Sequence, residues 1–326
     1  MRSGGVEQRE RLTLTKATFE ATVQSTDQSG AVSANPAPRF RLADYAVLLK
    51  PRVMSLVVFV GLVGLLLAPG AIAPWRAAVA VLCIAVAAGA AGAINMWYDR
   101  DIDVFMRRTM NRPIPAGRMR PAEALVLGVV LASGAVLAMA LAVNGIAAAL
   151  LALTVLYYVF VYTVWLKRRT PQNIVIGGAS GAFPPVIGWA AVTGTVGVES
   201  LALFAIIFLW TPPHSWALAL FSNRDYANAG VPMLPVVAGP RETKKQILVY
   251  TALLVAATFV PVFVGMSGAV YAMAASVLDA AFVAFALRLW RGDDDGPARA
   301  LFGFSILYLF LIFVSLLADR ALAALG

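Results

Sequence analysis

The sequence is poor in charged residues and in cysteine. Of its 326 residues, 13% are charged, 60% are hydrophobic and one, Cys83, is a cysteine. Soluble domains carry charge on about a quarter of their residues, so this composition excludes an ordinary soluble fold. A disulfide needs two cysteines, so the single thiol excludes an intrachain disulfide.

The first 40 residues lack an apolar run. They are rich in Ser, Thr, Gln, Glu, Arg and Gly. A secretory signal peptide needs an apolar stretch, so we expect no such signal in this segment. We expect residues 1–40 to form a disordered cytoplasmic tail and residues 41–326 to form one membrane domain.

Long uncharged apolar runs fill the remainder of the chain. Each run approaches the ~20 residues with which a helix crosses the hydrocarbon core of a membrane. The sequence therefore predicts an all-α polytopic membrane protein with nine transmembrane helices. The expected helices cover residues 47–67, 74–94, 122–142, 146–165, 174–192, 201–220, 247–266, 268–289 and 300–317.

Arginine and lysine favour one side of the predicted membrane domain. From Arg39 onward they fall in alternate loops, and Arg76 and Arg320 are the exceptions. Basic loops face the cytoplasm, so we expect the N-terminus and the loops 95–121 and 221–245 to be cytoplasmic. This topology and the anionic headgroups of membrane lipid explain the net charge of +9 without a nucleic-acid partner.

Three oxygen-bearing side chains recur at every fourth residue where the second apolar run meets water. They are Asn95, Asp99 and Asp103. On an α-helix this spacing places all three on one face, whereas Asp101 points nearly opposite to Asp99. Carboxylate and amide oxygens suit Mg²⁺, which takes a few protein ligands and leaves its other positions to water and phosphate.

Three arginines follow this row within nine residues of Asp103, namely Arg107, Arg108 and Arg112. Guanidinium groups bind phosphate oxygens through paired hydrogen bonds. The row and the arginines together predict a diphosphate clamp at the membrane surface. The plainer alternative is a solvated loop whose acids and arginines only set the topology.

Two titratable side chains lie inside predicted spans. His214, the single histidine, follows Trp210-Thr-Pro-Pro in the sixth span, and Asp279 lies near the middle of the eighth. Titratable groups are rare within membranes, so both are candidates for function. His214 either serves a site or bonds a backbone carbonyl freed by the prolines. Asp279 either pairs across helices or faces a cavity.

The motif Asn95-x3-Asp99-x3-Asp103, followed by Arg108-Thr109 and Arg112-Pro113, resembles the first Asp-rich motif of the UbiA superfamily of intramembrane prenyltransferases. The resemblance covers about residues 41–320. It implies nine helices around a central cavity, with cytoplasmic loops that bind Mg²⁺ and an isoprenyl diphosphate. The loops 95–121 and 221–245 would roof that cavity.

A wider set of segments resembles the branch of this superfamily that farnesylates haem. It implies transfer of a farnesyl group from farnesyl diphosphate to the 2-vinyl group of haem B, a substrate rather than a prosthetic group, at a bacterial inner membrane. Proteins that handle haem or assemble terminal oxidases are the implied partners. The segments are Met106-x-Arg108-Thr109-x2-Arg112-Pro113, Asn173-Ile-Val-Ile-Gly-Gly, Thr211-Pro-Pro-His214-x-Trp216-Ala-Leu and Asp225-Tyr226-x3-Gly230-x-Pro232-Met233-Leu-Pro235.

The resemblance also implies roles for individual residues. Asn95, Asp99 and Asp103 would bind Mg²⁺, and both aspartates would act in catalysis with Arg108 and Arg112. Asp225 has no second acid four residues away, so the number of Mg²⁺ ions, one or two, stays open. The residues expected to bind substrate are Asn95, Arg107, Asn173, His214, Trp216, Asp225, Tyr226 and Lys244.

Two other functions stay open from the sequence. A prenyltransferase acting on a chlorin or a quinone precursor would keep the Asp-rich motif, but it gives no account of the segment around His214. A secondary transporter would place carboxylates at the membrane midplane, where only Asp279 fits.

Overall fold

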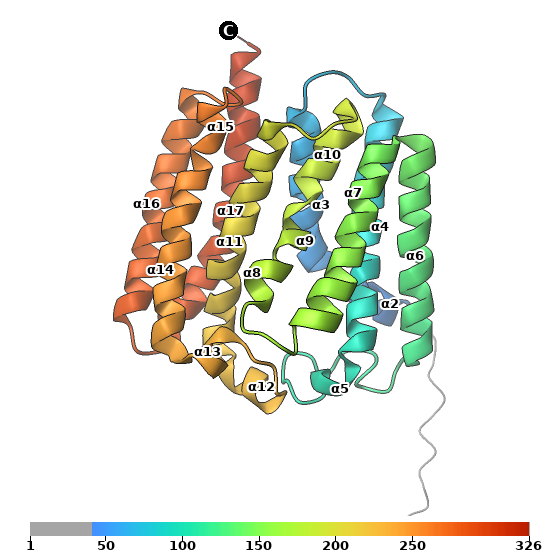
Figure 1. Cartoon of the computed structure of the whole chain (residues 1–326), viewed down its shortest axis with the longest axis vertical. Coiled ribbons are helices and arrows are strands. Elements are labelled where there is room, and N and C mark those ends of the chain that lie inside the picture. Colours follow the sequence, from blue (N-terminus) through green and yellow to red (C-terminus); the bar gives the residue numbers. More distant parts are fainter. Residues whose placement is uncertain (1–40, 326) are drawn as a thin grey trace, which may run out of the picture. The chain divides into compact units, whose positions relative to one another are not determined.

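The protein is a bundle of helices in the part of the chain that is described. The structure is a computed structural model, and it describes residues 41–325 except the side chains of residues 52 and 53. The predicted tail, residues 1–40, lies outside the described residues. Within 41–325 every regular element is a helix, and the long helices run side by side between two ends of the bundle (Figure 1). The all-α prediction is confirmed.

Within residues 41–325, eight helical segments are long and apolar enough to cross a membrane. Several of them consist of consecutive shorter helices. The eight segments are α4 (Pro74–Tyr98), α6 (Pro121–Ala142), α7 (Gly145–Leu156) with η1 (Tyr157–Leu166), α8 (Asn173–Gly177) with α9 (Ala179–Ala182) and α10 (Pro184–Thr193), α11 (Val198–Phe221), α14 (Gly239–Thr258) with α15 (Val260–Phe263), α16 (Ala269–Arg291) and α17 (Gly296–Ala323).

The predicted count of nine spans is not confirmed, because the first predicted span is divided at Lys50. α2 (Leu42–Leu48) precedes the break, and α3 (Pro51–Leu67), with 17 residues, follows it. Lys50 has a left-handed backbone, with φ 50° and ψ 51°. A residue before proline avoids the α conformation, so the helix restarts at Pro51.

The fifth span is interrupted at Gly178 and again before Pro184. Two of its glycines lie tightly against neighbouring helices. A Cβ at Gly177 would fall 2.2 Å from the ring of Tyr162, and one at Gly178 would fall 2.9 Å from the side chain of Thr211. These glycines therefore let the helices approach closely.

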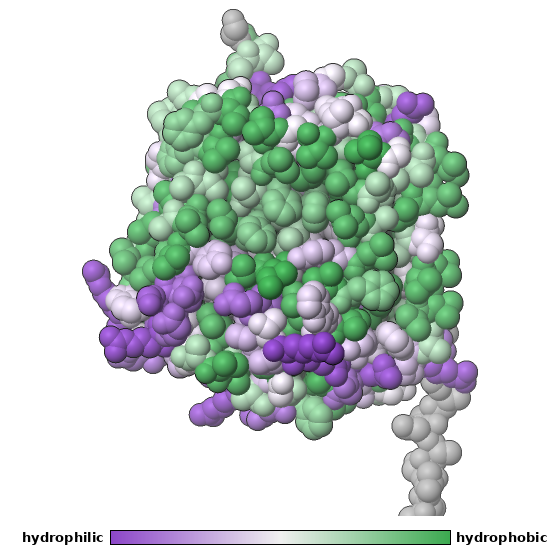
Figure 2. Space-filling model, viewed as in Figure 1, coloured by the Kyte–Doolittle hydropathy of each residue, from purple (hydrophilic) through white to green (hydrophobic). Residues whose placement is uncertain are grey.

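The basic loops gather at one end of the bundle. This end, the lower one in Figure 1, carries the short helices α5 (Arg100–Asp103), α12 (Asn223–Asn228) and α13 (Leu234–Val237). Figure 2 shows hydrophilic side chains concentrated there and a broad hydrophobic surface above them. Exposed apolar residues such as Leu141 and Val277, 80% and 70% exposed, suit a lipid environment.

Asp279 joins three helices inside the bundle. Its Oδ2 accepts a 2.7 Å hydrogen bond from Thr258 on α14, and its Oδ1 accepts a 2.6 Å bond from the hydroxyl of Tyr308 on α17. The residue is 4% exposed. Of the two alternatives for Asp279, the structure therefore supports pairing across helices.

Candidate functional site

Asn95, Asp99 and Asp103 lie where α4 ends and α5 begins. Asp99 is the junction between the two helices. Helical spacing continues through it, because the backbone N–H groups of Asp99 and Asp103 donate 2.9 Å bonds to the carbonyls four residues before them. The side-chain amide of Asn95 donates a 2.7 Å bond to Asp99 Oδ2. The predicted common face therefore holds for this pair.

Cations surround the two aspartates. Lys167 Nζ donates a hydrogen bond to Asp99 Oδ2, and Arg168 lies 3.6 Å from Asp99 Oδ1. Arg112 donates a 2.7 Å bond to Asp103 Oδ2. The sequence interpretation placed Arg112 in the site, but it assigned the two cations after η1 to topology alone.

Each aspartate keeps one oxygen without a hydrogen bond. Both side chains are fully buried, and Oδ1 of Asp99 and Oδ1 of Asp103 have no donor. A buried carboxylate oxygen without a donor is costly. This arrangement fits Mg²⁺, which binds through one or two carboxylates and completes its shell with phosphate and water. Among residues 41–325, no three His, Cys, Asp or Glu side chains form a metal-binding group.

Lys167 reaches the row because η1 is a π-helix of 10 residues. The backbone N–H of Lys167 donates a 2.9 Å bond to the carbonyl of Tyr162, five residues earlier. The step from Tyr158 to Lys167 would be about two and a half turns of an α-helix, which would put the two residues on opposite faces. The wider π turns bring them back to one face. Thr163 on η1 also accepts a 3.3 Å bond from Asn95.

Lys50 completes the ring of cations. Its Nζ donates a 3.3 Å bond to Asn95 Oδ1. Burial lowers the pKa of Lys50 to about 7, and the neighbouring charges of Arg112 and Lys167 act in the same direction. The left-handed backbone at this position is the feature that turns the side chain toward the row.

Asp101 lies outside the row, as its helical position predicts. Its two oxygens accept 2.7 Å bonds from the two terminal nitrogens of Arg168. This bidentate pair lowers the pKa of Asp101 and raises the pKa of Arg168. Asp101 thus holds the arginine that lies beside Asp99.

The two long loops meet at Arg108 and Tyr226. Arg108 donates a 2.9 Å bond to the Tyr226 hydroxyl, and its guanidinium lies 5.1 Å from the centre of the ring. Asp225, the residue before Tyr226, is half-buried. Arg107 is exposed to solvent. The predicted approach of the loops 95–121 and 221–245 to each other is confirmed.

Three residues that the resemblance assigned to substrate binding make other contacts. Lys244 donates a hydrogen bond to the carbonyl of Gly292, at the end of α16. Trp216 is buried with its ring 5.4 Å from that of Tyr250 on α14, and it lines neither cavity described below. Asn173 is buried, and its amide donates to the carbonyl of Thr170, while its Oδ1 has no donor.

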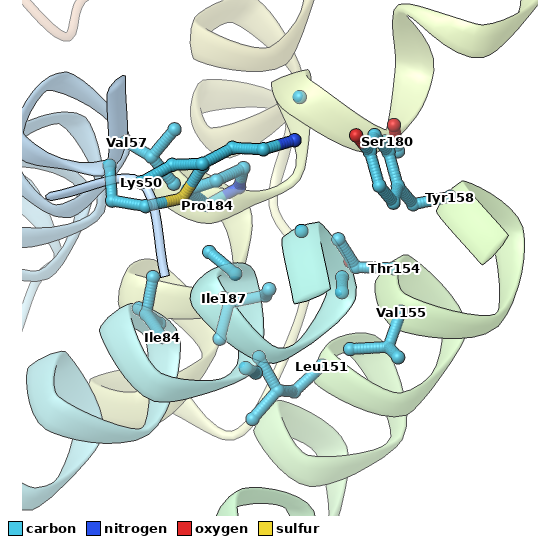
Figure 3. A pocket seen from close by; sticks show the side chains of 16 residues that line it. Lys50, Val57, Ile84, Leu151, Thr154, Val155, Tyr158, Ser180, Pro184 and Ile187 are labelled. Carbon is cyan, nitrogen blue, oxygen red and sulfur yellow. The ribbon is translucent and has the colours of Figure 1, made fainter. Parts of the chain in front are cut away.

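Two cavities lie inside the bundle next to the row. The Lys50 cavity has a volume of about 240 Å³, and Figure 3 shows the residues that line it. The His214 cavity has a volume of about 470 Å³. They share a wall formed by Val57, Tyr158, Ser180 and Gly181.

His214 is held rigidly at the wall of the second cavity. Its ring lies between those of Trp210 and Phe302, with centroids 4.3 Å and 4.7 Å away. Its Nδ1 is 2.7 Å from the hydroxyl of Ser305 on α17. The alternative in which His214 bonds a freed backbone carbonyl is not what the structure shows, because Nδ1 contacts this hydroxyl instead. Within residues 41–325, Nε2 therefore keeps its capacity for a ligand.

Comparison with known sequences gives one consistent result. The family model of the UbiA prenyltransferase family matches residues 57–316. A protoheme IX farnesyltransferase of Parvibaculum lavamentivorans is 58% identical over 287 residues, which cover 87% of this chain and 90% of the relative. One of Acidiphilium cryptum is 59% identical over 286 residues, which cover 85% and 90%.

Solved structures share the fold at low sequence identity. A digeranylgeranylglyceryl phosphate synthase superposes with a TM-score of 0.71 at 17% identity, covering 85% of this chain and 98% of the other. A UbiA homologue from Aeropyrum pernix gives 0.68 at 21%, covering 82% and 98%. One from Archaeoglobus fulgidus, bound to GPP and Mg²⁺, gives 0.58 at 17%, covering 84% and 99%.

Proposed function

This chain belongs to the UbiA prenyltransferase family, and from that premise we propose that it transfers a farnesyl group from farnesyl diphosphate to the 2-vinyl group of haem B. The products are haem O and diphosphate. The observation that carries the proposal is the identity of 58% along nearly all of a protoheme IX farnesyltransferase. The buried acidic row with its ring of cations supports the donor half of the reaction.

The row suits a magnesium diphosphate. Asn95, Asp99 and Asp103 would hold Mg²⁺, which supplies positive charge to the diphosphate oxygens when bound. The Oδ1 atoms of the two aspartates, which accept no hydrogen bond, support one ion. In the loop 221–245, Asp225 has no second acid four residues to either side, so a second ion would depend on ligands from the diphosphate.

The cations around the row suit the leaving group. Negative charge grows on the diphosphate as the allylic carbon–oxygen bond breaks and the electron pair leaves with oxygen. Lys50, Lys167 and Arg112 would stabilise that charge, because hydrogen bonds and ion pairs already hold them beside the row. Arg108 would exchange its bond to Tyr226 for a diphosphate oxygen.

The acceptor would react through its vinyl group. The vinyl π electrons form the new carbon–carbon bond to C1 of the farnesyl group, which leaves a cation on the vinyl carbon next to the ring. Water adds to that carbon and loses a proton, which gives a hydroxyethylfarnesyl side chain. Nearby aromatic rings, such as that of Tyr158, favour cationic intermediates by ~1 kcal/mol or more when desolvated.

His214 is the proposed contact for haem. A neutral imidazole with one free nitrogen ligates haem iron, and a hydrogen bond at the other nitrogen fixes the ring. The Ser305 bond at Nδ1 supports this arrangement with Nε2 toward the substrate. A chlorin or quinone acceptor gives no reason for this fixed ring, and a transporter loses its candidate carboxylate because Asp279 is bound by two hydroxyls.

The proposed location is a bacterial inner membrane with the row facing the cytoplasm. The grouping of basic loops at one end of the bundle supports this orientation (Figure 2). Haem is sparingly soluble in water, so proteins that deliver haem B or receive haem O are the proposed partners.

Purified protein in detergent tests the function directly. It would be incubated with haem B, isotopically labelled farnesyl diphosphate and Mg²⁺, and the products would be separated and weighed by mass spectrometry. We expect label in a haem whose mass has grown by one farnesyl group and one hydroxyl group. Label in a chlorin or a quinone precursor, and none in haem, would contradict the proposal.

A further inference from the structure

The Lys50 cavity continues the acidic row into the membrane. Lys50 bonds to Asn95 and also lines the cavity. One face of α4 forms its wall, because Ile84, Ala88 and Ala91 recur at helical spacing and lead up to Asn95. The cavity therefore follows α4 from Gly92 and Lys50, which bonds to the row, as far as Ile84, and we refer to it as a channel.

We propose that this cavity holds the farnesyl chain and that Ile84 sets the length of chain that the enzyme accepts. The proposal rests on the function proposed above. The lining is mainly alkyl, with Leu151 and Ile187 facing α4 across the space. In Figure 3, Lys50, Ser180 and Tyr158 lie along one side of this space, and Ile84 and Leu151 lie on the opposite side.

The length of the channel matches a chain of three isoprene units. At 1.5 Å per residue, Asn95 and Ile84 are about 16 Å apart along the axis of α4. An extended chain advances roughly 1.2 Å per bond, as in an extended backbone. The twelve in-line carbons of a farnesyl group then span about 14 Å. A geranyl chain spans about 10 Å and a geranylgeranyl chain about 19 Å.

The volume of the cavity indicates where the reacting end of the farnesyl chain lies. A cavity of 150 Å³ holds benzene, so a cavity of 240 Å³ holds roughly ten carbons, or two isoprene units. The first unit then lies at the mouth, beside Tyr158 and Ser180. These two residues also line the His214 cavity, which has the larger volume that a ring acceptor needs. The new bond would form at this shared wall.

Ala88 lies one helical turn from Ile84, about 6 Å nearer to the row. One isoprene unit adds about 5 Å to an extended chain, so a larger side chain at this position would shorten the channel by one unit. Ala88→Leu should therefore favour geranyl diphosphate. Ile84→Ala should lengthen the channel and favour geranylgeranyl diphosphate.

The test is a competition among the three diphosphates. Wild-type protein and each variant would receive haem B, Mg²⁺ and equal amounts of geranyl, farnesyl and geranylgeranyl diphosphate. Mass spectrometry would then measure the ratio of the prenylated haems. Extra or missing methylenes in an apolar pocket change selectivity roughly 10- to 200-fold. We expect each variant to shift the product ratio about tenfold or more in its own direction.

Ala78→Leu is the matched control, because Ala78 is an exposed residue of the same helix. It should keep the wild-type ratio. If Ala88→Leu does not remain monodisperse in detergent, Thr154→Leu, which fills the cavity from α7, takes its place. Wild-type ratios in the folded variants, or an equal loss with all three donors, would overturn the chain-length assignment. Wild-type protein that prenylates no haem from any donor would overturn the proposed function instead.

Discussion

Arg108 and Tyr226 join the two loops above the site, through a 2.9 Å hydrogen bond and a guanidinium that lies 5.1 Å from the ring centre. The two residues are far apart in the sequence. Because Arg108 is also a proposed diphosphate contact, its side chain would couple closure of the two loops to binding of the diphosphate.

Tyr226→Phe removes the hydroxyl and keeps the ring. We expect the loop 221–245 to open more often, because a hydrogen bond to a charged group contributes about 1.5 to 3 kcal/mol. Hydrogen exchange of the backbone amides in that loop measures the change, and Tyr226→Ala should increase exchange further. Equal exchange in wild type and both variants would show that the contact does not hold the loop.

Asp99→Asn and Asp103→Asn should each reduce formation of prenylated haem about 100-fold or more. Each substitution removes a buried negative charge at the proposed Mg²⁺ site while it keeps the size of the side chain. Size-exclusion chromatography in detergent checks that the variants fold. Near wild-type turnover in both would refute the assignment of the row to Mg²⁺.

Lys167→Met should reduce turnover by about 10²-fold, a typical effect of removing one preorganised charge from an active site. Lys167 lies against Asp99, whereas Arg169, two residues later, is exposed. Arg169→Met is therefore the matched control and should keep wild-type activity. Equal losses in the two variants would point to a general effect of charge on this loop.

His214→Ala should weaken haem binding about tenfold, or 1.4 kcal/mol, and leave the KM for farnesyl diphosphate unchanged. The reason is that His214 lines the His214 cavity and is absent from the lining of the Lys50 cavity. Absorbance titration with haem measures the binding. Trp216→Phe, a change outside both cavities, should bind haem normally, and an unaltered haem titration in His214→Ala would return this residue to a structural role.

Asp279→Ala should lower stability by about 1 to 3 kcal/mol, because it leaves the hydroxyl of Tyr308 buried without its acceptor, whereas Thr258 can still donate to the carbonyl of Val255. Thermal unfolding in detergent measures the loss. Ser276→Ala, at an exposed position of the same helix, should have little effect. We expect turnover of Asp279→Ala to stay near wild type below its unfolding temperature, and a loss of turnover without a loss of stability would place Asp279 in the site.

Two residues that the resemblance assigned to substrate binding contact other parts of the bundle, and the cause is geometric. Trp216 is only two residues from His214, but two residues on a helix are separated by about 160° around the axis, so the two rings face different neighbours. Lys244 follows the second loop closely, yet its side chain reaches the carbonyl of Gly292. A motif gives the order of residues along the chain and leaves the direction of each side chain open.

The sequence alone determined the class of protein and the position of the acidic row. Apolar runs of span length, basic loops on one side and the four-residue spacing of Asn95, Asp99 and Asp103 are local features, and local features are readable from the order of residues. The spacing also separated Asp101 from the row.

Tertiary structure decided which cations face the row and where the cavities lie. Lys50 and Lys167 reach Asn95 and Asp99 because the chain takes a left-handed turn before Pro51 and a π-helical path through η1. Those conformations, like the partners of Asp279 and the two cavities, depend on contacts between helices that are far apart in the sequence. Such contacts are set by packing of the whole bundle, which no local pattern records.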